Sequence, residues 1–231
     1  MRQASMATEP FHRSTVAALF TAQVRRTPDA LAVVAGQTRL SYAELGARVF
    51  QLARSLRRRG LADEEIVGIA VPRSAEMVVG VLAAMVAGGA FVPLDPAWPA
   101  QRRRQVLADA AVTHVLDDLD LTRWAHHDES PEPLDLDLAP GRLAYVVFTS
   151  GSTGRPKGAM IRHEAICERL RWQVEEILGF GPGDASLFKA PLAFDISVNE
   201  ILLPLVSGGY VVVAEPGGER DPQYLLDLIA A

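Results

Sequence analysis

One stretch of the sequence decides its fold class: Leu143-Ala-Tyr-Val-Val-Phe-Thr149-Ser-Gly-Ser-Thr-Gly-Arg-Pro-Lys157-Gly158. Its first part is an unbroken apolar run, which predicts a strand that is buried on both faces. Such strands are typical of parallel sheets that helices cover on both sides. Its second part, rich in glycine and hydroxyl residues, predicts a loop that follows the strand directly.

Strand-like and helix-like segments alternate on both sides of this stretch. The expected strands are 31–34, 38–40, 66–71, 91–94, 113–116, 143–149, 185–189 and 210–213. The expected helices are 16–24, 41–56, 74–87, 99–110, 163–178, 196–206 and 221–229. Residues 117–142, with several prolines and many acidic side chains, are expected to form a surface loop. The alternation predicts an α/β fold with mainly parallel sheets covered by helices.

The composition is that of an ordinary globular protein. The chain has 231 residues, of which 49% are apolar and 22% are charged, and its formal net charge is −5. A single cysteine excludes a disulfide framework and fits a cytoplasmic location. The negative charge argues against nucleic-acid binding, and no apolar run is long enough to cross a membrane. Residues 1–12 contain no apolar segment of a secretory signal, and we expect them to be a disordered tail.

The loop at 149–158 has the composition of a polyphosphate-binding site. Its glycines let backbone N–H groups turn toward a ligand, its hydroxyls add donors, and Lys157 adds a mobile cation. The order of glycine and lysine differs from that of a Walker A loop, and the glycine spacing differs from that of a nucleophile elbow. A flexible surface loop is the alternative, but the preceding strand and the lysine favour phosphate binding.

Asp195 is a lone carboxylate in the apolar run Pro191-Leu-Ala-Phe-Asp-Ile196. A carboxylate in apolar surroundings needs a partner. One hypothesis is that Asp195 binds a charged group of a substrate. The alternative is that Asp195 or Ser197 caps the following helix, because Ser197 and Glu200 have the spacing of a capping box. Both can hold at once, with Ser197 as the cap and Asp195 toward a ligand.

Four motifs, in order, resemble the core motifs of the adenylate-forming, or AMP-binding, superfamily. They are Leu40-Ser-Tyr-Ala-Glu-Leu45, Ala87-Gly-Gly-Ala-Phe-Val-Pro-Leu-Asp-Pro96, the loop Thr149–Gly158, and Leu192-Ala-Phe-Asp-Ile-Ser197. The second motif and Asp195 are typical of the amino-acid adenylation domains of nonribosomal peptide synthetases. The resemblance implies that residues 13–231 are a partial AMP-binding domain, the N-terminal part of the large domain of the adenylate-forming fold.

The resemblance also implies a role for each matching residue. The phosphates of ATP would be bound by Thr149, Ser150, Gly151, Ser152, Thr153, Gly154, Lys157 and Gly158. Lys157 would also act in catalysis by neutralising phosphate charge. Phe194 would lie beside the acyl-adenylate and Asp195 would pair with the α-ammonium of an amino acid. Two further residues would line the side-chain pocket, Ile196 and Asn199.

ATP and Mg²⁺ are the cofactors that the resemblance implies. The glutamate that binds magnesium in the family has no counterpart in this sequence, and neither has the catalytic lysine of the small C-terminal subdomain. No metal site is expected in the chain itself, since His126-His127-Asp128 has no further ligand at suitable spacing.

The implied activity is the ATP-dependent conversion of an amino acid to an aminoacyl-adenylate, which is then loaded onto a phosphopantetheine carrier domain or protein. Because the later motifs are missing, we expect the chain alone to be inactive, with the remainder of the domain as a partner. Two alternatives stay open: an acyl-CoA synthetase-like ligase, and a non-catalytic fragment or half of a split domain. The sequence identifies neither the amino acid nor the peptide product.

Overall fold

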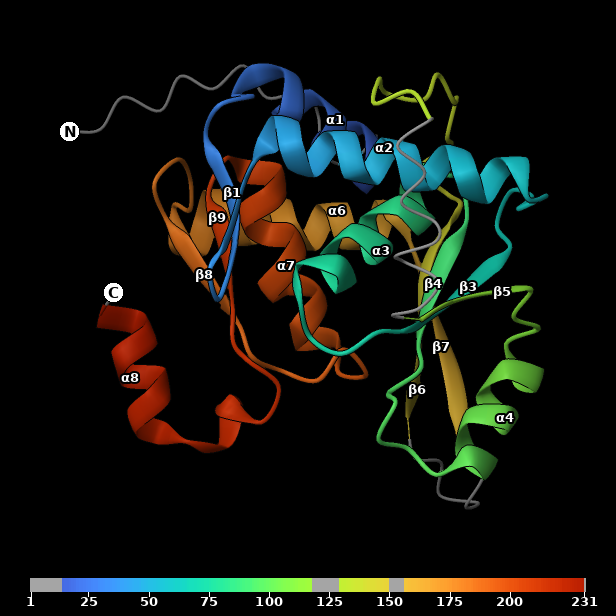
Figure 1. Ribbon diagram of the computed structural model, residues 1–231. Helices are drawn as coiled ribbons and strands as arrows, with labels where there is room; N and C mark the ends of the chain where they lie inside the picture. The colour runs from blue at the N-terminus through green and yellow to red at the C-terminus, as the bar shows by residue number, and fades with distance from the viewer. Residues whose placement is uncertain (1–13, 118–128, 150–155, 231) are drawn as a thin grey trace.

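The computed structural model describes residues 14–117, 129–149 and 156–230. These residues form two β-sheets with helices between and around them (Figure 1). The tail expected at 1–12 and the middle of the long loop, 118–128, lie outside the described residues. The predicted α/β class and the mainly parallel sheets are confirmed.

The first sheet joins segments from opposite ends of the described chain. Its strands are β1 (Leu31–Ala35), β2 (Thr38–Ser41), β8 (Ala185–Phe188) and β9 (Tyr210–Val213). They lie in the order β2-β1-β9-β8. β1 and β2 form an antiparallel hairpin, whereas β9 runs parallel to both β1 and β8 and places Val211 opposite Val33. The fold of the N-terminal hairpin therefore depends on a strand that is far away in sequence.

The second sheet carries the stretch that decided the fold class. Its strands are β3 (Ile66–Ala70), β4 (Ala90–Pro93), β5 (His114–Asp117), β6 (Leu143–Thr149) and β7 (Lys157–Arg162). They lie in the order β5-β3-β4-β6-β7, with all pairs parallel except β6 and β7.

The sequence analysis did not predict β7, which the structure adds where only a loop was expected. β7 is an edge strand, and all its residues except Ile161 are exposed. An edge strand is held in the sheet by backbone hydrogen bonds and does not require a buried apolar face. Its residues therefore need not follow the hydrophobic pattern of a buried strand.

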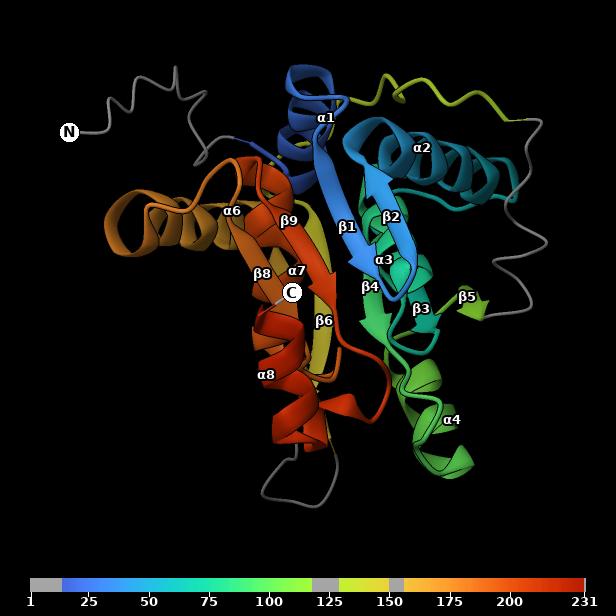
Figure 2. The same ribbon diagram turned by 60° about the vertical axis from the view of Figure 1, so that its left-hand side comes forward.

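The helices cover the sheets and fill the space between them. They are α1 (Val16–Arg26), α2 (Tyr42–Arg58), α3 (Ala75–Val86), α4 (Ala100–Asp109), α6 (His163–Trp172), α7 (Asp195–Ser207) and α8 (Pro222–Ala230). A π-helical turn, Gln173–Leu178, continues α6, and a 3-10 turn, Gly218–Arg220, precedes α8. Figure 2 shows α3 and α7 between the two sheets. Every residue of α3 except Glu76 is buried, so this helix forms the centre of the core.

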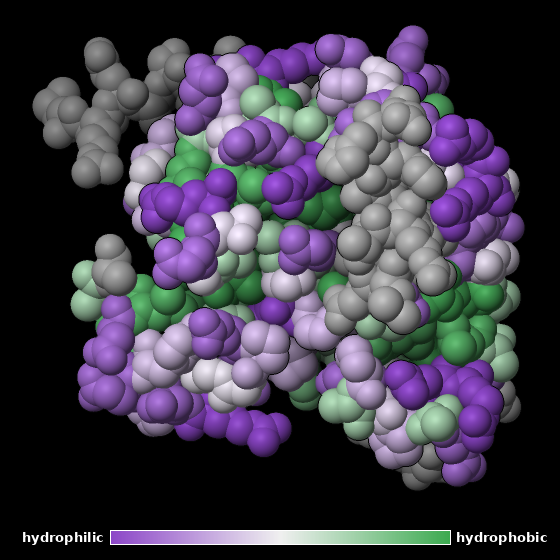
Figure 3. Space-filling view, viewed as in Figure 1, coloured by the Kyte–Doolittle hydropathy of each residue, from purple (hydrophilic) through white to green (hydrophobic). Residues whose placement is uncertain are grey.

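The last helix, α8, differs from the others because it buries none of its residues. Leu226 and Ile229 remain 61% and 69% exposed. The space-filling view shows apolar surface, in green, on and beside this helix at the lower left (Figure 3). None of the described helices combines the length and the apolar character that a membrane crossing requires.

The start of α2 is held by two polar interactions. Ser41 and Glu44 form the predicted capping box: Ser41 Oγ accepts from Glu44 N–H at 3.2 Å, and Glu44 Oε2 accepts from Ser41 N–H at 2.8 Å. The next residue, Tyr42, is fully buried, and its hydroxyl donates to Gly209 O at 2.7 Å and Pro204 O at 3.0 Å. Burial raises the pKa of this phenol well above its usual range. Tyr42 therefore remains a donor that ties α2 to the end of α7.

We expect Tyr42→Phe to lower the free energy of unfolding by about 1–3 kcal/mol, because two buried carbonyl groups lose their shared donor. Urea denaturation measures this change. Tyr210→Phe is the matched control, since within the described part of the chain the Tyr210 hydroxyl makes no hydrogen bond. Equal midpoints for wild type and Tyr42→Phe would contradict the prediction.

His163, the first residue of α6, is buried and connects α6 to the start of α1. His163 is only 1% exposed, and its Nδ1 accepts from Val16 N–H at 3.3 Å. The ring is therefore neutral with its proton on Nε2, a tautomer inferred from this hydrogen bond. Burial lowers the pKa of His163 to about 4, since a charged ring loses its hydration.

This burial makes part of the stability depend on pH. The unfolded chain binds a proton at His163 below about pH 6.5, whereas the folded chain does so only below about pH 4. The stabilisation by the neutral ring is thus complete above pH 6.5 and falls by about 3 kcal/mol between pH 6.5 and pH 4. In His163→Asn the unfolding free energy should fall less steeply over this range than in wild type. Urea denaturation at a series of pH values between about 4 and 7 measures both slopes, and equal slopes would contradict the prediction.

Candidate active site

The predicted phosphate-binding loop connects β6 to β7. Thr149, the last residue of β6, pairs with Lys157, the first residue of β7, and Thr149 Oγ1 lies 3.5 Å from Lys157 O. The loop therefore closes a hairpin, and the exposed Lys157 returns to the edge at which Thr149 leaves the sheet. The remaining predicted phosphate ligands lie outside the described residues: Ser150, Gly151, Ser152, Thr153 and Gly154.

Gly158 has a packing role in addition to its predicted contact with phosphate. It pairs with Phe148 across the hairpin. A Cβ atom at this position would lie 3.1 Å from Val146 Cγ1 and 3.2 Å from Phe148 Cζ. The absence of a side chain therefore leaves room for two apolar side chains of β6.

A cavity of about 810 Å³ opens beside this hairpin. Its walls come from β6, β7, α6, the turn before α7 and the segment 95–102. The lining residues are Asp95, Trp98, Arg102, Tyr145, Val147, Phe148, Thr149, Ala159, Ile161, Ala165, Ile166, Arg169, Pro191, Ala193, Phe194 and Asp195. The walls are mostly apolar, with two carboxylates and two guanidinium groups. This size and mixture are typical of a small-molecule site.

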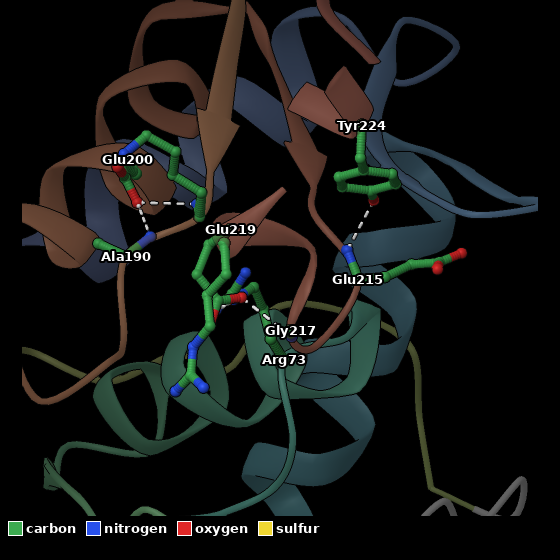
Figure 4. Close-up of polar contacts among 9 residues, drawn as sticks. Arg73, Ala190, Glu200, Glu215, Gly217, Glu219 and Tyr224 are labelled. Atoms are coloured by element: carbon green, nitrogen blue, oxygen red, sulfur yellow. Dashed lines mark hydrogen bonds and ion pairs between the residues drawn. The ribbon is translucent and has the colours of Figure 1, made fainter. Parts of the chain in front are cut away.

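The turn that carries Phe194 to the cavity is held by two side chains of α7. Glu200 accepts from the backbone N–H groups of Lys189, at 3.1 Å, and Ala190, at 2.9 Å (Figure 4). Ser197 Oγ donates to Phe194 O at 2.6 Å. The geometry of the turn is therefore set by the helix that follows it.

These contacts correct the capping hypothesis for α7. The N-cap is Phe194, and no side chain forms a cap hydrogen bond there. Ser197 and Glu200 have capping-box spacing, but both lie inside the helix and bind the preceding turn instead. Neither polar residue caps the helix, because backbone groups of the turn compete for the same side chains.

Asp195 is the first residue of α7 and lies in the cavity wall. Its partner is Arg169 of α6, with 3.2 Å between Asp195 Oδ2 and Arg169 Nη1. The sequence analysis did not single out Arg169, because it belongs to no motif and only the packing of α6 beside α7 brings it to Asp195. Both charges act on nearby Tyr145, whose pKa burial raises to about 12, so its hydroxyl stays protonated at neutral pH.

The other predicted substrate residues lie in different surroundings. Phe194 lines the cavity and is 61% exposed. Ile196 is 48% exposed and Asn199 only 4%, and neither belongs to the lining of the cavity among the described residues. Asn199 lies next to the Arg169 side chain. With the Asn199 amide oxygen turned toward the guanidinium, this oxygen accepts from Arg169 Nη2 at 2.8 Å and from Arg169 Nε at 3.2 Å.

A smaller cavity of about 330 Å³ adjoins the first and shares Asp95, Pro191 and Ala193 with it. Arg73 lies in its wall over the ring of Phe188 and pairs with Glu219 at 3.1 Å (Figure 4). Glu219 also accepts from Gly217 N–H at 2.9 Å. These contacts hold the segment before α8 against the ends of β3 and β8.

The sequence and the fold of this chain match those of known proteins. The family described as AMP-binding enzyme matches residues 20–231. The chain belongs to this family.

Among curated relatives of this AMP-binding chain, tyrocidine synthase 3 of Brevibacillus parabrevis is 44% identical over 220 residues, which cover 90% of the chain and 3% of that protein. Phosphinothricin tripeptide synthetase PhsB of Streptomyces viridochromogenes is 42% identical over 226 residues, which cover 90% of the chain and 19% of that protein. The chain thus spans less than a fifth of the length of these relatives.

Solved structures share the fold. The nonribosomal peptide synthetase FmoA3, bound to alpha-methyl-L-serine-AMP, superposes with a TM-score of 0.86 at 30% identity over 96% of this chain and 26% of that one. The N-terminal subdomain of Klebsiella oxytoca NpsA, in complex with 3-hydroxybenzoyl-AMSN, gives a TM-score of 0.81 at 28% identity over 92% of this chain and 57% of that one.

Proposed function

We propose that this AMP-binding chain takes part in the ATP-dependent activation of an amino acid to its aminoacyl-adenylate, within nonribosomal peptide synthesis. The observation that carries the proposal is the placement of Asp195. Asp195 lines the same cavity as Thr149, the residue at which the predicted phosphate hairpin begins. The names of the relatives, peptide synthetases and an aminoacyl-AMP complex, support the same activity.

In the proposed reaction, a carboxylate oxygen of the amino acid attacks the α-phosphorus of ATP. The new bond joins that oxygen to the α-phosphate, and the bond to the bridging oxygen breaks, so that pyrophosphate leaves with the electron pair. Asp195 would hold the ammonium, and Phe194 would pack beside the acyl group. Lys157 and the hairpin would neutralise the charge that develops on the leaving pyrophosphate.

Mg²⁺ enters this proposal through the family. The described residues contain no group of three or more histidine, cysteine, aspartate or glutamate side chains that could hold a metal ion. We therefore assign no magnesium ligand and derive no step through the metal. Transfer of the aminoacyl group to a phosphopantetheine carrier, a cytoplasmic location and contact with the remainder of an adenylation domain likewise stay proposals.

The test is ATP–pyrophosphate exchange with the protein produced from its full reading frame, assayed with each amino acid in turn. The proposal expects exchange that depends on one amino acid or a small group of them. Exchange with only fatty or aryl acids would instead indicate the acyl-CoA synthetase-like alternative. A complete lack of exchange with every acid would indicate a non-catalytic chain.

We expect Asp195→Ala to lower kcat/KM for the amino acid roughly 10- to 100-fold, since the ammonium loses a charged hydrogen-bond partner. The KM for ATP should remain near wild type in steady-state exchange assays. Asp227→Ala, on the exposed face of α8, is the matched control and should behave as wild type. A similar rise in the KM for ATP would show that the loss of Asp195 disturbs the whole site and not only the binding of the amino acid.

Lys157→Ala should lower kcat roughly 100-fold, because a cation that stabilises developing charge in the transition state is removed. Arg162→Ala removes an exposed cation at the other end of β7 and serves as the control. Single-turnover formation of the aminoacyl-adenylate measures the chemical step separately from product release. An unchanged rate would remove Lys157 from the proposed machinery.

A further inference from the structure

We propose that Arg169 is a positioning residue for the amino acid, because its guanidinium holds Asp195 with one carboxylate oxygen free for the incoming ammonium. The inference rests on the proposed function, since it takes Asp195 as the group that binds the ammonium. It extends that function to a residue of α6 that lies outside the four motifs.

The contact with Asp195 uses one of its two oxygens. Arg169 Nη1 donates to Asp195 Oδ2 at 3.2 Å. Among the residues that the structure describes, Asp195 Oδ1 forms no hydrogen bond and no ion pair. An ammonium group in the cavity can therefore bind Oδ1 while Arg169 keeps its hold on Oδ2.

Asn199 holds Arg169 in turn. Asp195 and Asn199 lie four residues apart on α7 and thus on the same face of the helix. With the Asn199 amide oxygen assigned to the side that faces Arg169, as the surrounding donors require, this oxygen accepts from Nη2 and Nε of Arg169, while Nη1 reaches Asp195. One planar guanidinium therefore bridges both residues, with three nitrogen atoms at fixed angles. A lysine could not do this, because its ammonium is a single point of charge.

Burial distinguishes this arrangement from an ordinary surface ion pair. The side chains of Arg169 and Asp195 are 40% and 66% exposed, and an exposed pair alone contributes little to stability. Asn199, in contrast, is buried, so the guanidinium is anchored to the core at one end and reaches the cavity wall at the other. The expected effect is therefore on the orientation of Asp195 rather than on folding.

The like charge of Arg169 works against the ammonium, since two cations near one carboxylate repel each other. Asp95, which also lines the cavity, adds a second negative charge, and Arg102 adds a second positive one. The described lining thus holds two charges of each sign and does not by itself favour a cation. The orientation of Asp195 therefore has to strengthen ammonium binding by more than the repulsion from the guanidinium weakens it, and mutation of Arg169 measures the balance.

The experiment compares three variants in ATP–pyrophosphate exchange, with the protein produced from its full reading frame. Arg169→Met removes both the charge and the planar guanidinium. Arg169→Lys keeps the charge but replaces the guanidinium with a single ammonium. Arg171→Met is the matched control, because Arg171 lies on the same helix and pairs outside the cavity with Glu168 and Glu175. Both Arg169 variants should raise the KM for the amino acid about tenfold, with the KM for ATP and the thermal midpoint unchanged.

A double-mutant cycle adds a readout that a merely structural role would not produce. Asn199→Ala should raise the KM for the amino acid by a smaller factor than Arg169→Met. The double variant Arg169→Met with Asn199→Ala should be no worse than Arg169→Met alone, because Asn199 acts through Arg169. Additive effects of the two changes would contradict this link.

Two results would overturn the inference while the proposed function stands. One is an unchanged KM for the amino acid in both Arg169 variants. The other is a lower KM in Arg169→Met, which would show that the guanidinium competes with the ammonium for Asp195. If the unmodified protein exchanges pyrophosphate with no amino acid at all, the proposed function fails, and this inference fails with it.

Discussion

The antiparallel pairing of β6 with β7 is the interaction on which the candidate site depends. β6 is the last parallel strand of its sheet, and without β7 its outer edge would be unpaired. The ladder places Lys157 opposite Thr149, so both ends of the glycine-rich loop lie at the same edge of the sheet. It also brings Ala159 and Ile161 beside the side chains of β6 as one wall of the cavity. Backbone hydrogen bonds thus position a site whose lining mixes buried, half-buried and exposed side chains.

The part of the cavity wall that carries Asp195 depends on polar side chains of α7 that bind the backbone of the preceding turn. Glu200 and Ser197 bind backbone groups of the turn before α7 and fix the position of that turn relative to the helix, which begins at Asp195. Arg169 then connects Asp195 to α6. The carboxylate is therefore positioned by its own helix, α7, and by Arg169 of α6, while much of its surface remains open to a ligand. This explains how one charged residue can stand in an apolar motif without being buried.

The two halves of the site belong to different sheets. The hairpin ends the second sheet, whereas the turn before α7 follows β8 of the first. The buried helices α3 and α7 lie between these sheets, and α7 carries Asp195 to the cavity (Figure 2). The parallel pairing of β1 with β9 and the Tyr42 hydroxyl join the N-terminal hairpin to the same core. Stability and site geometry therefore depend on the same contacts.

Local sequence patterns were sufficient to predict several parts of the fold and of the candidate site. Apolar runs located the buried strands, the Ser41–Glu44 box located the start of α2, and the ordered motifs located the loop and Asp195. Only the tertiary structure decided the rest. β7 has almost no buried face, the spacing of Ser197 and Glu200 fits a cap that they do not form, and Arg169 meets Asp195 only because α6 packs beside α7. Periodicity records which residues are buried, but it does not record which distant polar groups will compete for the same partner.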